Sequence, residues 1–534
     1  MLSGADKVIS KAAASNGIQP HGSKGHPKHA IGLFAFLAIT SSMVMTIYNY
    51  PVFGTTGFAL VFFLLAAGLL WFVPAALVSA EMATGESGWS DAGVFSWGTA
   101  AFGKRWGFVM IYLQFMQITI GMIAMLYFVT AAFATLFSPA FNENALLKFA
   151  TVFCVFWLVT IANFWGTRVV AKIATWGFTI GILLPATLVV ALGIIFVMGD
   201  NTINIVMDSK TFFPSFAETA TLVVFVSFIL SFMGIEGSAT HVNDLRNPGR
   251  NYPLAVFVLV AGAILLNCLG GLTVAVAIPA KEINLSAGLY ETIGRLLELY
   301  SLHWLVYPAA VCIAFGAIAE ISSWVSSPSR GLRFSASQGL LPPSFARRNK
   351  HGVSIRILLI QGIIVTAWML LLTFGTSSGQ TTQKDSGAGN VAFFTTEALT
   401  VLTYLSMYVL LFLSYLKLKV KHPSNPRKFS MPAWLGWIIS LVGLAATLFA
   451  YVIGWFRPSQ IPESSYSAYL MILACGFIVI FVIPHIIYHF AKDEWGQKAR
   501  DLMVNDDFSK SLAEHGVSDE EVNQANLAAA HGGV

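Results

Sequence analysis

Apolar residues form repeated runs of about 20 along the chain, and short polar stretches separate these runs. A run of this length can cross the hydrocarbon core of a bilayer as an α-helix. The pattern therefore predicts an all-α membrane protein with about twelve transmembrane helices. The expected spans cover residues 31–53, 57–83, 107–137, 147–165, 174–198, 217–242, 253–279, 304–327, 353–374, 391–416, 432–456 and 466–490.

Composition agrees with a membrane protein. The chain has 534 residues, of which 56% are hydrophobic and 11% are charged, whereas soluble domains average about 25% charged residues. The net charge of +5 is small and gives no indication of a nucleic-acid partner. The four cysteines fall inside apolar runs, so we expect buried apolar side chains and neither disulfides nor metal ligands. No motif in the sequence suggests a cofactor.

The distribution of lysine and arginine predicts the orientation in the membrane. If the N-terminus lies inside, the inner connections carry most of these residues. The outer connections then hold only Lys148, Lys210, Lys281, Arg295, Lys384 and Arg457. We therefore expect both termini in the cytoplasm, with a polar segment 1–30, a transmembrane domain 31–490 and an acid-rich tail 491–534.

The sixth apolar run is interrupted by an unusual polar sequence. Glu236 lies between two glycines in residues 234–237, which read GIEG. Glycine allows the backbone to unwind, and an unwound backbone inside a membrane is tolerated only when protein buries it or when it lines a cavity. A carboxylate there costs at least about 2.5–3.5 kcal/mol. The sequence predicts a broken helix near Met233–Gly237 that forms a binding site; a glycine-kinked helix with a structural glutamate is the alternative.

Polar residues also cluster in the middle of the first run, which predicts a second break near Met43–Thr46. Two breaks five spans apart fit a pair of inverted repeats, at about 31–198 and 217–416, with extra helices at 432–490. The alternative for the first run is an ordinary helix with small polar packing residues.

Two further spans contain polar side chains at helical spacing. Glu320 lies in the eighth apolar run, and Trp324 follows one turn later on the same face. Tyr404 and Tyr408 are four residues apart in the tenth run and share a face. These side chains are candidates for the wall of a cavity. A glutamate bound to a neighbouring helix and tyrosines at the membrane interface are the alternatives.

Several of these segments resemble known sequences. Residues 232–239 (FMGIEGSA) and 247–253 (NPGRNYP) resemble the sixth helix of the amino acid–polyamine–organocation superfamily. Residues 238–243 (SATHVN), the AEISSW run at 319–324, both tyrosines of the tenth span and the YNYP ending at 48–51 narrow the resemblance to the bacterial glutamate/γ-aminobutyrate antiporters. At residues 44–46 the chain has Val-Met-Thr where the superfamily often has Gly-Ser-Gly.

The resemblance implies a LeuT-type fold of five-plus-five inverted helices with broken first and sixth helices. It also implies exchange of external glutamate for internal γ-aminobutyrate across a bacterial inner membrane, favoured in acid and supporting acid resistance. Glutamate decarboxylase would be a metabolic partner only. The expected substrate-binding residues are Ser42, Met43, Tyr48, Gly234, Ile235, Glu236, Gly237, Glu320, Trp324, Tyr404 and Tyr408. Glu236 and Glu320 are also the candidates for proton coupling or gating.

Other functions stay open from the sequence. A transporter of the same fold could carry glutamine or a polyamine pair, because two glutamates within the membrane could bind a cationic amine. A channel or a nutrient sensor is a further alternative, although the tail is too short and polar for a signalling domain. A membrane enzyme lacks support because the chain has no metal-spaced His/Cys cluster, nucleophile elbow or Walker loop. The C-terminal plug of some family members has no clear match in this tail.

Overall fold

The computed structural model describes residues 32–86, 89, 92–199, 201–239, 245–326, 329–375, 386–458, 461 and 463–514. The segment 1–30, the SATHVN residues from 240 to 243 and the end of the tail lie outside these described residues. Within them the chain is helical, and the only extended pairing is an isolated bridge between Gly85 and Arg427. The prediction of an all-α membrane protein is confirmed.

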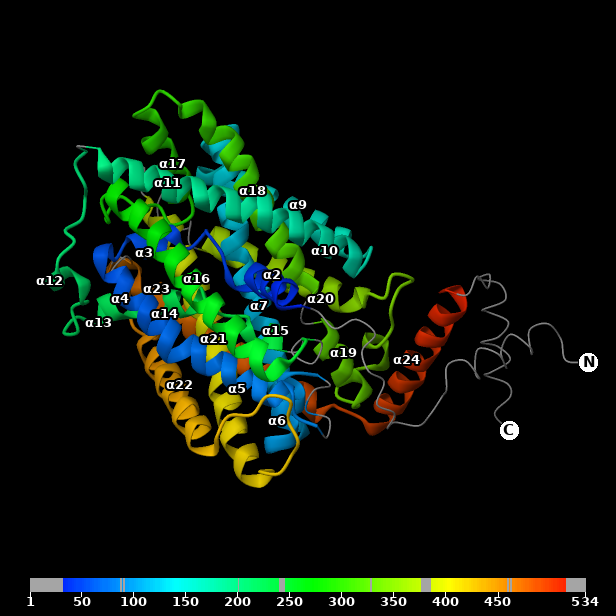
Figure 1. Ribbon diagram of the computed structural model, residues 1–534. Helices are drawn as coiled ribbons and strands as arrows, with labels where there is room; N and C mark the ends of the chain where they lie inside the picture. The colour runs from blue at the N-terminus through cyan, green and yellow to red at the C-terminus, as the bar shows by residue number, and fades with distance from the viewer. Residues whose placement is uncertain are drawn as a thin grey trace, which may run out of the picture.

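The helices follow one another along the chain, with connections of different lengths (Figure 1). The first part of the chain forms α2 (Leu33–Val44), α3 (Tyr50–Gly54), η1 (Gly57–Ala59), α4 (Leu60–Ala66), η2 (Ala67–Phe72), α5 (Val73–Ala83), α6 (Val94–Phe102), α7 (Lys104–Leu136), α8 (Ala140–Glu143), α9 (Ala145–Asn163), α10 (Thr167–Trp176), η3 (Gly177–Leu183), α11 (Leu184–Met198), α12 (Ser209–Phe212), α13 (Thr219–Val223), α14 (Phe225–Leu230) and α15 (Ile235–Ala239). The second part forms α16 (Pro248–Ala277), α17 (Gly288–Glu298), η5 (His303–Leu305), α18 (Val306–Ser326), α19 (Ser329–Ser337), η6 (Pro343–Phe345), α20 (Ile355–Gly375), α21 (Ser386–Lys421), α22 (Ala433–Ile453), η7 (Glu463–Ser465), α23 (Tyr466–His489) and α24 (Asp493–Glu514).

Ten helical segments in the described residues are long and apolar enough to cross a membrane. They correspond to ten of the twelve predicted spans, and a shorter apolar segment covers Thr221–Gly237. The two remaining predicted spans coincide with the broken segments α2–α3 and α13–α15. The count of twelve therefore stays a prediction about how these broken segments cross the bilayer.

The first predicted span is interrupted between α2 and α3. Helix α2 ends at Val44, Met45 is extended with φ −92° and ψ 115°, and α3 begins at Tyr50. Pro51 lies in the first turn of α3, where its missing N–H costs nothing, whereas farther inside a continuous helix it would remove a backbone hydrogen bond. The interruption at residues 45–49 lies slightly later in the chain than the sequence predicted.

The sixth predicted span is interrupted between α14 and α15. Helix α14 ends at Leu230, residues 231–234 form a turn, and α15 begins at Ile235. Gly234 has φ 106°, a conformation that side chains with a Cβ rarely adopt. The interruption ends at Gly234, earlier than predicted, so Glu236 belongs to the first turn of α15.

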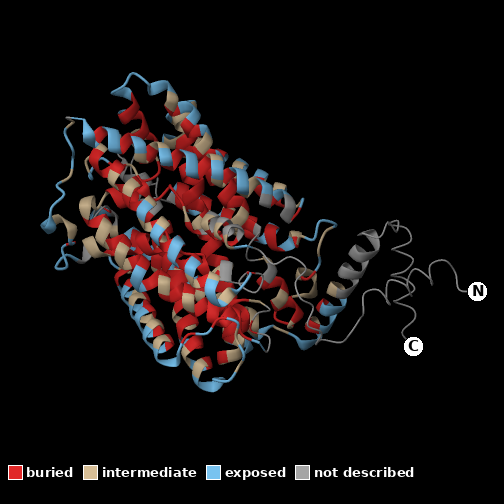
Figure 2. Cartoon of the chain, in the orientation of Figure 1, coloured by how far each residue is buried: buried red, intermediate tan, exposed pale blue. Residues whose placement is uncertain are grey.

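Helices α7 and α21 lie at the centre of the bundle and pack against each other along their length. Most residues of both helices are buried, whereas α9, α22 and α23 have exposed apolar faces (Figure 2). Exposed apolar surface of this extent marks contact with lipid. The central pair is therefore the scaffold against which the two broken segments are placed.

The π-helical segment η3 packs closely against α18. A Cβ at Gly181 would collide with the backbone of Gly316, and one at Gly177 would collide with Ala319. Small residues at such positions let two membrane helices approach closely. This contact fixes the position of α18, which carries Glu320.

A buried ion cluster joins α5 to the end of α21. Glu81 pairs with Lys419 and Arg427, and it also accepts hydrogen bonds from the Tyr415 hydroxyl at 2.7 Å and the Met431 backbone N–H at 3.2 Å. Its side chain is 1% exposed. Because each buried charge has an opposite partner, the cluster is tolerated in a nonpolar surrounding.

The described part of the tail forms α24, which packs against α19 and η6. Arg500 Nη1 donates to the Ser337 carbonyl oxygen at 2.8 Å, and the Lys492 N–H donates to the Gly339 carbonyl at 3.2 Å. Gly339 has φ 84° and lies against Gly496, so small residues occur on both sides of this contact. The tail therefore contacts the connection after α18.

We expect Glu81→Ala to lower the free energy of unfolding by about 3–5 kcal/mol, because it leaves two cations without their buried partner. The measurement is thermal unfolding of the purified protein in detergent. Glu463→Ala is the matched control, since Glu463 pairs with Arg457 at 3.4 Å while 89% exposed and such surface pairs contribute little. Equal unfolding midpoints for both variants would contradict the prediction.

Candidate functional site

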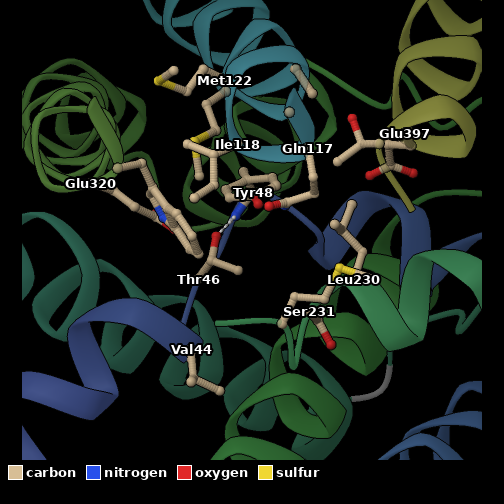
Figure 3. Close-up of a pocket in the computed structure, with 16 residues that line it drawn as sticks. Val44, Thr46, Tyr48, Gln117, Ile118, Met122, Leu230, Ser231, Glu320 and Glu397 are labelled. Carbon is tan, nitrogen blue, oxygen red and sulfur yellow. Dashed lines mark hydrogen bonds between the residues drawn. The ribbon is translucent and has the colours of Figure 1, made fainter. Parts of the chain in front are cut away.

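The two interruptions face each other across a cavity (Figure 3). The residues that line it are Val44, Thr46, Tyr48, Gln117, Ile118, Gly121, Met122, Ala124, Met125, Leu230, Ser231, Met233, Glu320, Trp324, Glu397 and Thr400. They come from both interruptions, α7, α18 and α21.

The first interruption supplies backbone and side-chain groups to this cavity. Thr46 Oγ1 accepts the Tyr48 N–H at 3.4 Å, which satisfies one of the donors that the break in the helix releases. Val44 and Thr46 line the cavity. The sequence named Ser42 and Met43, whose backbone lies in α2 and whose side chains are outside the described part of the structure.

Two carboxylates lie on opposite sides of the cavity. Figure 3 shows Glu320 on one side and Glu397 on the other, with Tyr48 and Gln117 between them. The Tyr48 side chain lies within Coulombic reach of both carboxylates. Trp324, one turn beyond Glu320 on α18, is also in the wall. The structure thus brings Tyr48, Glu320 and Trp324 together, as the sequence predicted.

Glu236 lies behind the cavity and is 2% exposed. Its two carboxylate oxygens accept from Gln114 Nε2 and from the Tyr408 hydroxyl, each at 2.7 Å. Gln114 belongs to α7 and Tyr408 to α21, so the carboxylate joins the short helix α15 to both central helices. It is not among the cavity-lining residues that the structure describes.

Tyr404 supports the second interruption directly. Its hydroxyl accepts the Gly234 N–H at 3.1 Å, and its ring meets Tyr408 edge to face with 4.9 Å between centroids. The two tyrosines therefore contact the backbone and the carboxylate behind the break. Ile235 and Gly237 belong to α15, and neither is among the described residues that line the cavity.

Comparison with known proteins places this architecture in a family. Residues 31–483 match the family model described as amino acid permease. The chain belongs to the amino acid permease family. It is a multi-pass membrane transporter.

Relatives of the permease include two glutamate/gamma-aminobutyrate antiporters, from Lactococcus lactis subsp. lactis and subsp. cremoris. Each is 42% identical to the chain over 463 residues, which cover 86% of this chain and 90% of the relative. An uncharacterized transporter of Legionella pneumophila is 29% identical over 461 residues, covering 86% of this chain and 96% of the relative.

Sequence reasoning missed Glu397 as a site residue of the permease. It is 2% exposed and lies inside the predicted span 391–416. The cost of a carboxylate inside an apolar span, which singled out Glu320, also applies to Glu397. Gln117, by contrast, carried no signal that separates a cavity-lining amide from one that packs between helices.

The described residues offer no set of metal ligands. No cluster of three or more His, Cys, Asp or Glu side chains there could hold a metal ion. The polar groups of the cavity are hydroxyls, an amide, carboxylates and the indole N–H of Trp324, so what the arrangement can do chemically is bind a small polar molecule.

We expect Gly234→Ala to destabilise the permease by more than about 1 kcal/mol, because alanine is strained at φ 106°. Gly294→Ala is the control: its added Cβ would lie 3.7 Å from its nearest neighbours in the regular helix α17, where alanine is favoured over glycine. Thermal unfolding in detergent measures both. A midpoint for Gly234→Ala at or above that of the unmodified chain would contradict the strained conformation.

Proposed function

We propose that the permease is an antiporter that exchanges glutamate for γ-aminobutyrate. The observation that carries a transport role is a cavity in the middle of the bundle, enclosed by two interrupted helices. The substrate pair rests on the two lactococcal relatives, which share 42% of aligned residues over most of both chains.

The unwound residues 45–49 and 231–234 would bind the carboxylate of each substrate through backbone N–H groups. Glu320, Trp324 and Tyr48 would select the rest of the molecule from the cavity wall. In the LeuT-type arrangement of repeats, one group of helices would rock against the other and expose the cavity to each side in turn.

Glu236 would couple the second interruption to this motion. Its carboxylate is held by one donor from α7 and one from α21. If α15 moves away from these helices, both hydrogen bonds must break or be exchanged for others. Breaking them is costly, because a buried carboxylate would be left without donors. Glu236 is therefore our candidate for the residue that transmits a change at the break to the bundle.

We place the permease in a bacterial inner membrane with both termini in the cytoplasm. Decarboxylation of glutamate consumes a cytoplasmic proton, and export of the γ-aminobutyrate product completes a cycle that raises internal pH. Glutamate decarboxylase would supply the internal substrate as a metabolic partner. This cycle would support acid resistance.

A transporter of another amino acid or of an amine is the second candidate. It is favoured by the two carboxylates in the cavity and by the absence of Lys, Arg and His among its described lining residues. Counterflow in proteoliposomes separates the candidates when glutamate, γ-aminobutyrate, glutamine, arginine and agmatine are tested in turn. Faster exchange of arginine or agmatine than of glutamate would favour the amine transporter.

We expect Glu320→Ala to lower glutamate/γ-aminobutyrate exchange about tenfold or more per folded protein, because a single charge-assisted hydrogen bond contributes about 1.5–3 kcal/mol. Exchange is measured by counterflow, and folding by gel filtration in detergent. Glu298→Ala, at an exposed position of α17, should exchange at the unmodified rate. Near-normal exchange by Glu320→Ala would return Glu320 to a structural role.

Exchange should be much faster in acid, roughly below pH 6, than at pH 8. Glutamate has a side-chain pKa of about 4.3, so about 10% is neutral near pH 5.3 and about 0.01% near pH 8.3. An ionised side chain would enter a cavity that already holds Glu320 and Glu397, where like charges repel strongly. Uptake should therefore rise as the pH falls.

Glutamate uptake into γ-aminobutyrate-loaded proteoliposomes between about pH 4.5 and 8.5 tests this dependence. The full chain is compared with one ending at residue 492, which lacks the contact between α24 and α19. A flat profile for both chains would contradict a protonation step at the site. A profile that becomes flat only on truncation would place the pH sensor in the tail.

A further inference from the structure

Glu397 lies on α21 between two cavities. It lines the central cavity and also a smaller one, whose other polar lining residues are Ser227 and Tyr469. The binding and coupling roles proposed above give Glu397 no contact with the substrate, and no motif in the sequence singles it out. Since a carboxylate within a membrane span is costly, its position requires a partner or a use.

Among the described residues, only one oxygen of Glu397 has a hydrogen-bond partner. Oε2 accepts from the Ser227 hydroxyl at 2.7 Å, whereas Oε1 is buried and has no partner. The hydroxyl of Thr400, one turn further along α21, donates a hydrogen bond to the Thr396 carbonyl oxygen at 2.7 Å. The serine thus fixes the carboxylate and leaves Oε1 free to accept from another donor.

A second unpaired acceptor lines the same cavity. Gln117 Oε1, on α7, is buried and has no hydrogen-bond partner. Both residues line the cavity, and Figure 3 shows Gln117 between Glu397 and Glu320. Two buried acceptors without donors indicate a ligand that donates hydrogen bonds.

The charge of the wall points to the same ligand. Two carboxylates line the cavity, and its described lining includes no Lys, Arg or His. An ammonium group has three donors, no acceptor and a positive charge. It would satisfy Glu397 Oε1 and Gln117 Oε1 together through charge-assisted hydrogen bonds, which are the strong kind.

We propose that Glu397 Oε1, with Gln117 Oε1, binds the ammonium group of the transported amino acid. This assignment rests on the proposed function, because it concerns the substrate of that same cavity. It places the amine against α21 and α7, and leaves the unwound residues and Trp324 to meet the other end of the molecule. The substrate class is therefore an amino acid with a free amine, and dicarboxylates without an amine are excluded.

Competition by two truncated substrates tests the assignment in proteoliposomes. n-Butylamine has the ammonium group without the carboxylate, and butyrate has the carboxylate without the ammonium group. Glu397→Gln keeps the size of the side chain and an acceptor for Ser227. We expect it to raise the KM for γ-aminobutyrate and the inhibition constant of n-butylamine by about tenfold or more. The inhibition constant of butyrate should stay the same or fall.

Three companion variants make the result specific. Glu397→Asp keeps the charge and should lie between Glu397→Gln and the unmodified chain. Gln117→Met removes the second acceptor. It should raise the inhibition constant of n-butylamine by a smaller factor than Glu397→Gln does. Tyr469→Phe should change none of these constants, although the Tyr469 hydroxyl is also buried without a partner. If Glu397→Gln does not fold, the inhibition constants of Glu397→Asp and Gln117→Met test the assignment in its place.

Each contrary outcome is distinct. If Glu397→Gln raises the inhibition constants of n-butylamine and butyrate equally, Glu397 has a structural role. An unchanged KM of this variant for γ-aminobutyrate would overturn the assignment. Slower exchange in both Glu397→Gln and Tyr469→Phe, with unchanged inhibition constants, would assign a proton path between the two cavities in its place. If the unmodified chain does not exchange glutamate for γ-aminobutyrate, the proposed pair is wrong. In that case the role of Glu397 is tested by ligand-induced shifts of the unfolding temperature. These shifts are measured with n-butylamine and with butyrate for each variant.

Discussion

Backbone polar groups inside a bilayer have no water to bind, and this constraint governs the whole structure. An interrupted helix releases such groups at the depth where they cost most. Here the protein supplies their partners: the Tyr404 hydroxyl accepts the Gly234 N–H, and Thr46 Oγ1 accepts the Tyr48 N–H. Residues of α7 and α21 line the cavity between the two interruptions, so the most buried of the membrane-spanning helices form its wall.

Four buried carboxylates differ in how completely the described structure satisfies them, and this difference separates their roles. Glu81 has two cations and further donors, which is typical of a fixed structural cluster. Glu236 has one neutral donor for each oxygen, which holds α15 to its neighbours without an opposite charge. Glu397 has a donor for one oxygen only. Glu320 and Glu397 line the cavity, where a ligand can supply what the protein does not.

Sequence reasoning predicted the spans, both interruptions and three cavity residues, because each leaves a local signal. Apolar length marks a span, glycine beside a carboxylate marks the second break, and the spacing of Glu320 and Trp324 marks one face of a helix. It did not find the partners of Glu236, since Gln114 and Tyr408 are 122 and 172 residues away in the chain. Distances of that kind depend on how helices pack. Sequence reasoning also did not predict that α15 begins at Ile235, because this start depends on the conformation of Gly234. Glu236 therefore lies behind the cavity and does not line it.

One face of α21 connects these features. Glu397, Thr400, Tyr404 and Tyr408 are separated by three or four residues, so they lie along one side of the helix. Along that side the helix meets in turn the smaller cavity, the central cavity, the Gly234 N–H and the Glu236 carboxylate. Ligand contact and the support of the second interruption therefore share a rigid element. A displacement of α21 relative to α14 and α15 changes all of these contacts together, and a ligand that binds Glu397 biases the same helix that holds the break.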